Sequence, residues 1–212
     1  ASFLAELRRG WGDLPPATVI GNGRDLPAPP PRPRRPVYKA AGPQWDAAKG
    51  VELLAAVAPE LPWPVEVAGP LPETGGAAGA LPGLRHRGVL TPDETLAAMA
   101  AAELFVAPAR YEPFGLAVLE AAAMGGALVL ADLPSFRELW DGAARFVPPG
   151  DAGALRAALT DLARDPAARE RLRRASQERA RMYDATSMTR GWAALYGAVL
   201  EDGVTRPAAG AA

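Results

Sequence analysis

Short apolar runs that favour β-strands alternate with helical segments along the middle of this 212-residue chain. The runs contain few polar residues, which is typical of strands buried on both faces of a parallel sheet. The segments between them space apolar residues as helices that cover such a sheet do. The pattern predicts an α/β fold: a Rossmann-like parallel sheet with helices on both faces. The expected strands are residues 37–42, 65–69, 87–90, 104–108, 127–132 and 144–147.

Capping residues mark where several helices begin. Thr91, Pro92 and Glu94 have the spacing of a capping box with proline at the first helical position. Ser135 is expected to cap a shorter helix. Helices are also expected at residues 49–58 and 114–124, and the chain after residue 151 is expected to be helical.

The pattern divides the chain into five segments. Residues 1–25 predict an amphipathic helix and a strand at residues 18–20, which cannot bury a core alone and are expected to belong to a preceding domain. A proline-rich stretch predicts a stiff linker. The boundaries are 26–36 for the linker, 37–185 for the α/β domain, 186–201 for a last helix and 202–212 for a disordered tail.

The C-terminal helices carry an arginine-rich stretch and an apolar stripe. Residues 169–174, with Glu170 and Glu178, predict a solvated charged face. The stripe requires burial, either in the domain's own core or against a neighbouring domain. It consists of Met188, Trp192, Leu195, Tyr196 and Val199.

The overall charge and the absence of cysteine exclude several classes of partner. A net charge of −1 gives no reason to expect nucleic acid or an anionic membrane. The lack of cysteine excludes disulfides and cysteine-ligated metal, and it fits a reducing compartment. No apolar run is long enough to span a bilayer, and no signal peptide opens the chain. A cytoplasmic location is therefore expected.

Candidate chemistry is expected where the strands end. Doubly wound sheets bind ligands at the carboxyl ends of their strands. Functional residues should therefore lie just after Gly42, Gly69, Leu90, Pro108 and Asp132.

One carboxylate lies before the helix that follows the fourth expected strand, and another lies within that helix. Glu120 is the only charged or polar side chain between Phe114 and Met124. Its burial requires hydrogen-bond donors, such as sugar or ribose hydroxyls; the alternative is a surface helix residue. Glu112 precedes the same helix, and the backbone at Gly115 offers an anion site there. Glu112 could also simply complement the helix N-terminus.

Lys49 adds positive charge after the first expected strand. It is one of only two lysines in the chain, Lys39 being the other. A compact ammonium suits a phosphate group as a point charge. The alternative is a solvent-exposed helix residue.

The segment EPFGLAVLE, residues 112–120, resembles the E-x7-E motif of retaining family 4 glycosyltransferases, which have the GT-B fold. It lies within PARYEPFGLAVLEAAAMGGALVLAD, a context similar to that family's. Other segments are also similar to the family and occur in the family's order, and the resemblance extends from residue 2 to about residue 200. These segments are VIGNGRD, WDAAKG, PWPVEVAG, RGVL, LPSFREL and VPPGD. The chain therefore resembles one half of a GT-B fold, the C-terminal domain that binds the donor.

This resemblance implies a nucleotide-sugar donor and a role for each motif residue. Glu112 would bind hydroxyls of the donor sugar, Glu120 the ribose and Lys49 the diphosphate. Glu112 and Lys49 are thus the implied catalytic residues. Phe114, Gly115 and Leu116 would give backbone contacts to the diphosphate, and residues 87–90, with Val89 and Leu90, would flank the base. His86, beside them, is most simply incidental.

The chain departs from the family in two ways. The family usually has an arginine after the glycine that ends the first strand, where this chain has Pro43 and Gln44. Arg110, or less directly Lys39, would have to supply that charge; otherwise donor binding is weakened. The resemblance also implies that the N-terminal domain, which carries the acceptor site, is nearly absent. That domain, in a longer chain or a separate one, is therefore an expected partner.

The resemblance implies transfer of a sugar with retention of configuration, through an oxocarbenium-like transition state. The sequence contains no Asp-x-Asp motif and no metal-spaced cluster of histidines and acids, so no metal and no cofactor are expected. The alternative is a non-catalytic module that binds a nucleotide or nucleotide sugar. An epimerase or phosphorylase on the same fold is a third hypothesis. The sequence does not specify the sugar, the base or the acceptor.

Overall fold

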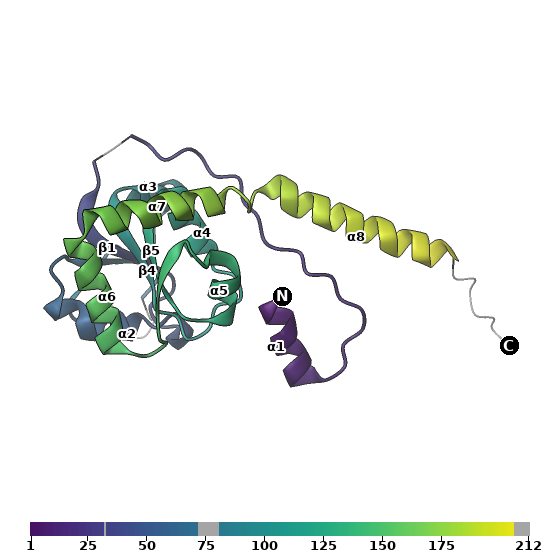
Figure 1. Cartoon of the computed structure of the whole chain (residues 1–212), viewed down its shortest axis with the longest axis horizontal. Coiled ribbons are helices and arrows are strands. Elements are labelled where there is room, and N and C mark those ends of the chain that lie inside the picture. Colours follow the sequence, from purple (N-terminus) through teal and green to yellow (C-terminus); the bar gives the residue numbers. More distant parts are fainter. Residues whose placement is uncertain (32, 72–80, 206–212) are drawn as a thin grey trace.

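A computed structural model describes residues 1–31, 33–71 and 81–205, with side chains up to residue 201 (Figure 1). Its centre is a six-stranded sheet in the order β3-β2-β1-β4-β5-β6, and every neighbouring pair is parallel. The predicted Rossmann-like sheet is therefore confirmed. The strands are β1 (Arg35–Ala41), β2 (Val65–Ala68), β3 (Leu84–His86), β4 (Ala102–Ala107), β5 (Ala127–Ala131) and β6 (Ala144–Val147).

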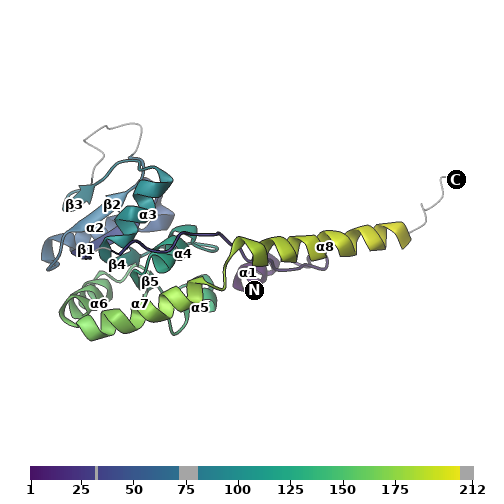
Figure 2. The same cartoon turned by 90° about the horizontal axis from the view of Figure 1, so that it is seen from above.

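Helices cover both faces of this sheet (Figures 1 and 2). One face carries α2 (Val51–Val57) and α6 (Ala152–Arg164). The other carries α3 (Pro92–Ala100), α4 (Leu116–Ala123) and α5 (Pro134–Trp140). The helix α7 (Pro166–Ala180) contributes to both layers. The remaining helical elements are α1 (Ser2–Trp11), η1 (Ala47–Lys49), η2 (Ala58–Glu60) and α8 (Ala185–Thr205).

Alternation along the strands divides the apolar core in two. Tyr38 and Leu104 are fully buried under α2 and α6, whereas Phe105 and Leu128 are buried under the helices of the opposite face. Both faces are covered, so the strands contain almost no exposed positions and read as continuous apolar runs. This explains why the sequence pattern predicted most of the strands.

Several predicted boundaries are wrong by a few residues. The third strand is β3, ahead of the predicted residues 87–90, which form the loop after it. The predicted helix at 49–58 is interrupted at Gly50, whose φ of 65° lies in the left-handed region. The capping box of Thr91 and Glu94 is confirmed. Ser135 lies inside α5, whose N-cap is Leu133, and does not cap it.

The predicted strand at residues 18–20 is wrong, because these residues pair with no described strand. Ile20 instead lies beside α8, where a side chain added at Gly191 would meet it at 3.1 Å. β-Forming residues make a strand only where another strand supplies hydrogen bonds. In the proline-rich stretch, residues 26–31, 33 and 34 have no regular structure, but Arg35 and Pro36 already belong to β1.

The arginine-rich stretch of α7 is only partly the solvated face that was predicted. Arg169 is buried, donates to the carbonyls of Leu162 and Ala163, and stacks on Trp63. Arg173 bonds Glu103 and the carbonyl of Gly125. Runs of charged residues usually lie in solvent, but arginine can also satisfy carbonyls that the end of a helix or a turn leaves unpaired.

The helix α8 projects away from the sheet and leaves much of its apolar stripe exposed (Figures 1 and 2). Trp192 and Tyr196 stack on each other with ring centroids 5.9 Å apart, and both are exposed. The stripe is therefore not buried in the described core. The helix reaches Thr205, so residues 202–205 are not the expected tail; residues 206–212 lie outside the described part.

Lys39 is fully buried in the middle of β1, and its ammonium bonds no described residue. Burial lowers the pKa of Lys39 from 10.5 to about 8, against a smaller opposing effect of Glu66. The folded state therefore favours the neutral amine. Below pH 8 the folded protein must hold a buried ammonium, which lowers the free energy of unfolding. This destabilisation disappears as pH rises from about 8 towards 10.5, because Lys39 then loses its proton more readily in the folded than in the unfolded chain. We expect Lys39→Met to raise the free energy of unfolding at pH 7 by up to about 3 kcal/mol.

The measurement is urea unfolding between pH 7 and 9.5, below the range in which ionisation of the buried Tyr38 contributes. The difference in stability between Lys39→Met and wild type should shrink as pH rises. Lys49→Met, which changes the only other lysine, should not reproduce this trend. A pH-independent difference would show that the Lys39 ammonium is accommodated in its buried position.

Candidate functional site

A cavity at the carboxyl edge of the sheet lies between β1 and β4. The strand order reverses at this pair, and such a switch point leaves a crevice where α/β proteins bind ligands. The cavity measures about 470 Å³. It is lined by residues of β1, β4, the start of α4 and the loops between them, among them Pro43, Lys49, Glu112, Phe114, Gly115 and Leu116.

The loop after β1 is held against the loop after β4, and this contact positions Lys49. The Asp46 side chain accepts a bond from the Ala48 amide and caps η1. The Ala48 carbonyl accepts bonds from the amides of Arg110 and Tyr111, at 2.8 and 3.3 Å. A side chain at Gly50 would stand 2.2 Å from the Pro108 carbonyl oxygen. Only glycine permits this approach with the left-handed backbone found there.

Lys49 and Glu112 form an ion pair at the wall of the cavity. The Lys49 Nζ lies 2.6 Å from Oε2 of Glu112, and both side chains are largely buried. The other oxygen of Glu112 accepts a bond from the Gly115 amide at 3.0 Å. The Ser135 hydroxyl donates to the Glu112 carbonyl at 2.5 Å. Glu112 is thus fixed at both its side chain and its backbone.

The helix α4 begins at this cavity without a side-chain cap. Its N-cap residue is Gly115, with φ of 87°. A side chain at Gly115 would come within 2.9 Å of the Phe136 ring, so the position has no room for one. The first amides of a helix have no intrahelical acceptor and attract anions. The start of α4, where an anion site was predicted, therefore lies on the cavity wall with Lys49, and the Gly115 amide there is already bonded to Glu112.

Glu120 lies one turn further along α4 and does not line the cavity. Its side chain is 14% exposed and forms an ion pair with Arg24, which comes from the N-terminal segment. Burial raises the pKa of the Glu120 carboxyl, and Arg24 acts in the opposite direction. The two motif carboxylates thus differ: Glu112 lines the cavity, whereas Glu120 does not, although Leu116, one turn before it on α4, does.

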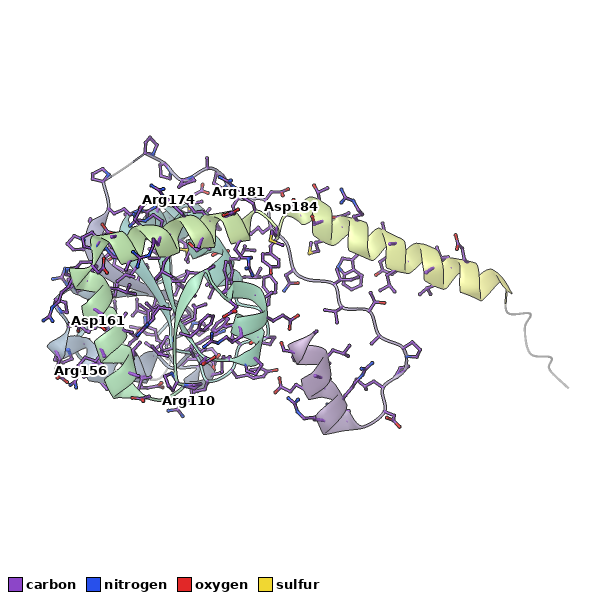
Figure 3. The ribbon with its side chains drawn as sticks, in the orientation of Figure 1. Arg110, Arg156, Asp161, Arg174, Arg181 and Asp184 are labelled. Atoms are coloured by element: carbon purple, nitrogen blue, oxygen red, sulfur yellow. The ribbon has the colours of Figure 1, made fainter. Side chains whose placement is uncertain are left out.

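Neither candidate replacement for the family's arginine reaches this cavity. Lys39 is enclosed in the sheet. Arg110 is exposed and lies at the edge of the domain away from α8 (Figure 3). It lines a second cavity of about 170 Å³, between α1 and residues 110–113. Glu112 lines both cavities, so the smaller one adjoins the larger.

The residues predicted to flank a base lie after β3, outside the cavity lining. Val89 is 76% exposed and Leu90 is partly buried. The Gly69 amide bonds the Gly88 carbonyl at 2.9 Å, which ties this loop to the end of β2. His86 does not line the cavity either, and its Nε2 bonds the Leu81 carbonyl.

Sequence reasoning missed two residues of the N-terminal segment. Asn22 lines the large cavity, and Arg24 pairs with Glu120. Both lie in VIGNGRD, a segment recognised by its similarity to the family, but nothing local indicates that it returns to the site. Among the described residues no group of three or more histidines and acids is placed to hold a metal ion. None of the described helices combines the length and hydropathy needed to cross a bilayer.

Comparison with known proteins identifies relatives of this arrangement. The family model described as glycosyl transferases group 1 matches residues 36–165. The chain is 39% identical over 111 residues to phosphatidyl-myo-inositol mannosyltransferase of Mycobacterium leprae, covering 51% of this chain and 30% of that protein. The chain thus spans about a third of that relative.

Solved structures share the fold. Sucrose-phosphate synthase from Thermosynechococcus elongatus aligns with a TM-score of 0.82 at 23% identity, over 95% of this chain and 57% of that chain. The Anabaena protein HepE, solved in complex with UDP-glucose, aligns with a TM-score of 0.66 at 18% identity, over 76% of this chain and 48% of that one. The fold is that of GT-B glycosyltransferases, and since the family model matches more than half of the sequence, the chain belongs to the glycosyl transferases group 1 family.

Proposed function

We propose that this domain binds a nucleotide-diphosphate sugar and serves as the donor-binding half of a retaining hexosyltransferase. The observation that carries the proposal is the convergence of Lys49, Glu112 and the first amides of α4 on one cavity at the switch point. A cation and a helix N-terminus suit a diphosphate. A fixed carboxylate suits sugar hydroxyls. The UDP-glucose bound to the related HepE fold supports this class of ligand.

Each residue has a role in this proposal. The diphosphate lies against the backbone of Phe114, Gly115 and Leu116, with Lys49 beside it. Glu112 accepts bonds from the sugar hydroxyls. Glu120 accepts bonds from the ribose hydroxyls, and the loop with Val89 and Leu90 flanks the base.

In the proposed reaction, the bond between the anomeric carbon and the diphosphate oxygen breaks. A bond to the acceptor oxygen then forms on the same face of the sugar, and the proton of the acceptor hydroxyl passes to the departing diphosphate oxygen. Negative charge accumulates on the leaving diphosphate, where Lys49 and the α4 amides stabilise it. No metal ion is required in this scheme.

The acceptor and the N-terminal GT-B domain are the proposed partners. That domain would be part of a longer chain or a separate one. The acceptor would approach from the side of the smaller cavity, because Glu112 lines both. We place the reaction in the cytoplasm, where sugar nucleotides are available.

A second candidate function is binding without catalysis. It is favoured by Pro43, which leaves Lys49 as the only cation lining the described cavity. Supplying an N-terminal GT-B half from a relative separates the two. Donor hydrolysis or transfer with retained configuration supports the enzyme, and unchanged donor supports the binding module.

Donor affinity should depend on the charge of Lys49. One class among UDP-, GDP- and ADP-sugars should bind the chain in a calorimetric titration. Lys49→Ala should weaken that binding by about 1.5–3 kcal/mol, or more than tenfold, because it removes a charge-assisted contact.

Arg174→Ala is the matched control, because it removes an exposed cation far from the cavity. It should leave the affinity unchanged. Equal losses in both variants would indicate a general charge effect, and no binding at millimolar ligand would refute the proposed donor site.

Restoring the missing arginine should strengthen donor binding. Pro43 lines the cavity beside Lys49, so Pro43→Arg adds a second cation for the diphosphate. We expect affinity to rise by about 1 kcal/mol, roughly fivefold. Pro43→Gln makes the same backbone change without the charge and should give no gain. A similar effect of both variants would place the diphosphate away from Pro43.

Metal removal should not impair donor binding. Titrations after treatment with EDTA and after addition of Mg²⁺ should give the same dissociation constant within error. A loss of affinity in EDTA that Mg²⁺ restores would show that a divalent ion, and not Lys49 alone, neutralises the diphosphate.

A further inference from the structure

The segment that carries Arg24 is anchored where α7 meets α8. The Arg24 amide donates to the Tyr183 carbonyl at 3.0 Å, and the Asp25 side chain accepts a bond from the Ala185 amide at 3.1 Å. A side chain at Gly23 would stand 2.0 Å from the Asp184 carbonyl oxygen. Figure 3 shows Asp184 at this junction. The backbone on both sides of Arg24 is thus fixed independently of its side chain.

This anchoring brings the Arg24 guanidinium to Glu120, from a position 96 residues away in the sequence. The guanidinium engages Oε1 of Glu120, and no described residue bonds the other oxygen. Asn22, two residues before Arg24, lines the donor cavity. Leu116, one turn before Glu120 on α4, lines it too. Helical side chains lean towards the N-terminus of their helix, so the Glu120 carboxylate is directed towards the cavity end of α4.

The surroundings of Glu120 otherwise disfavour its negative charge. Burial raises the pKa of the Glu120 carboxyl, and Arg24 is the one described charged group that opposes the shift. None of the charged residues on the elements packed against α4 is among the groups that shift the pKa of Glu120. These charged residues are Asp93 and Glu94 on α3, Glu103 on β4, and Arg169, Glu170, Arg171, Arg173, Arg174, Glu178 and Arg179 on α7.

Two of these cations, Arg173 and Arg179, are bonded to other groups. Arg173 bonds Glu103 and Glu170, and Arg179 donates to the carbonyls of Leu139 and Asp141. Neither is free to replace Arg24.

We infer that Arg24 is a positioning residue of the donor site, which holds one oxygen of Glu120 and stabilises its negative charge so that the other oxygen can accept hydroxyl groups of a nucleotide sugar. This inference rests on the proposed function of Glu120 as the ribose ligand. Arg24 does not need to touch the donor. It makes the carboxylate a stronger acceptor and fixes its direction.

The test is donor affinity as a function of pH in Arg24→Gln, Arg24→Lys and wild type. Without Arg24, Glu120 takes up a proton at a higher pH, so donor affinity should begin to fall at a higher pH than in wild type. An opposite charge shifts a carboxyl pKa by one unit or more, so the loss should approach about tenfold once the pH falls below the pKa of Glu120 in wild type, and it should disappear at alkaline pH. Arg24→Lys should restore much of the wild-type profile.

Three outcomes would overturn the inference. An equal loss at every pH would indicate a merely structural role. Unchanged affinity would show that Glu120 does not need Arg24. Tighter binding in Arg24→Gln would mean that Arg24 competes with the ligand. A double-mutant cycle completes the test, because Arg24→Gln should have no further effect in a Glu120→Gln background.

A ligand-free measurement separates this inference from the proposed function. Carboxyl ¹³C NMR of wild type and Arg24→Gln reports the Glu120 titration directly. The pKa of Glu120 should be higher in the variant whether or not a nucleotide sugar binds. Failure of all nucleotide sugars to bind wild type would refute the proposed function. An unshifted Glu120 titration would refute the role of Arg24 alone.

Discussion

The candidate site depends on one close backbone contact, that of Gly50 with Pro108. A side chain at position 50 would stand 2.2 Å from the Pro108 carbonyl oxygen, and the Ala48 carbonyl accepts hydrogen bonds from the amides of Arg110 and Tyr111 in the same loop. The loop after β1 is therefore fixed against the loop after β4. Lys49 and Glu112 meet as a consequence of backbone packing, and their ion pair does not have to create that geometry. A site built in this way is preorganised before any ligand arrives.

The two edges of the sheet treat their polar groups in opposite ways. At the edge where the strands begin, arginine and serine side chains satisfy backbone carbonyls. Arg34 donates to the carbonyls of Ala100, Ala102 and Met124, Arg173 to that of Gly125, and Ser176 to that of Gly126. At the carboxyl edge the start of α4 has no side-chain cap. The Gly115 amide there bonds Glu112, but the first amides inside α4 have no intrahelical acceptor, whereas the opposite edge is closed by the chain itself.

Local patterns predicted the parts of the molecule that local physics determines. The buried strands, the Thr91 capping box and the acids before and within α4 could be predicted from residue type and spacing. The errors arose where a distant partner decides. Residues 18–20 form no strand because no other strand is beside them, and Arg169 is buried because Glu103 and the carbonyls of α6 surround it. Arg24 was missed for the same reason, since its partner lies 96 residues away.

Charge in the proposed site is already balanced without a ligand. Glu112 is paired with Lys49 and Glu120 with Arg24, so these four side chains sum to zero. The two ion pairs therefore offset part of the desolvation cost of these carboxylates within the fold, and sugar hydroxyls need only reach their remaining acceptor positions. A diphosphate instead brings negative charge that no unpaired cation lining the described cavity offsets. Lys49 has three donors and can bridge Glu112 and a phosphate oxygen without breaking its ion pair. Bridging of this kind makes hydroxyl recognition the strong part of the proposed site and diphosphate recognition the weak part, as expected where proline occupies the position of an arginine.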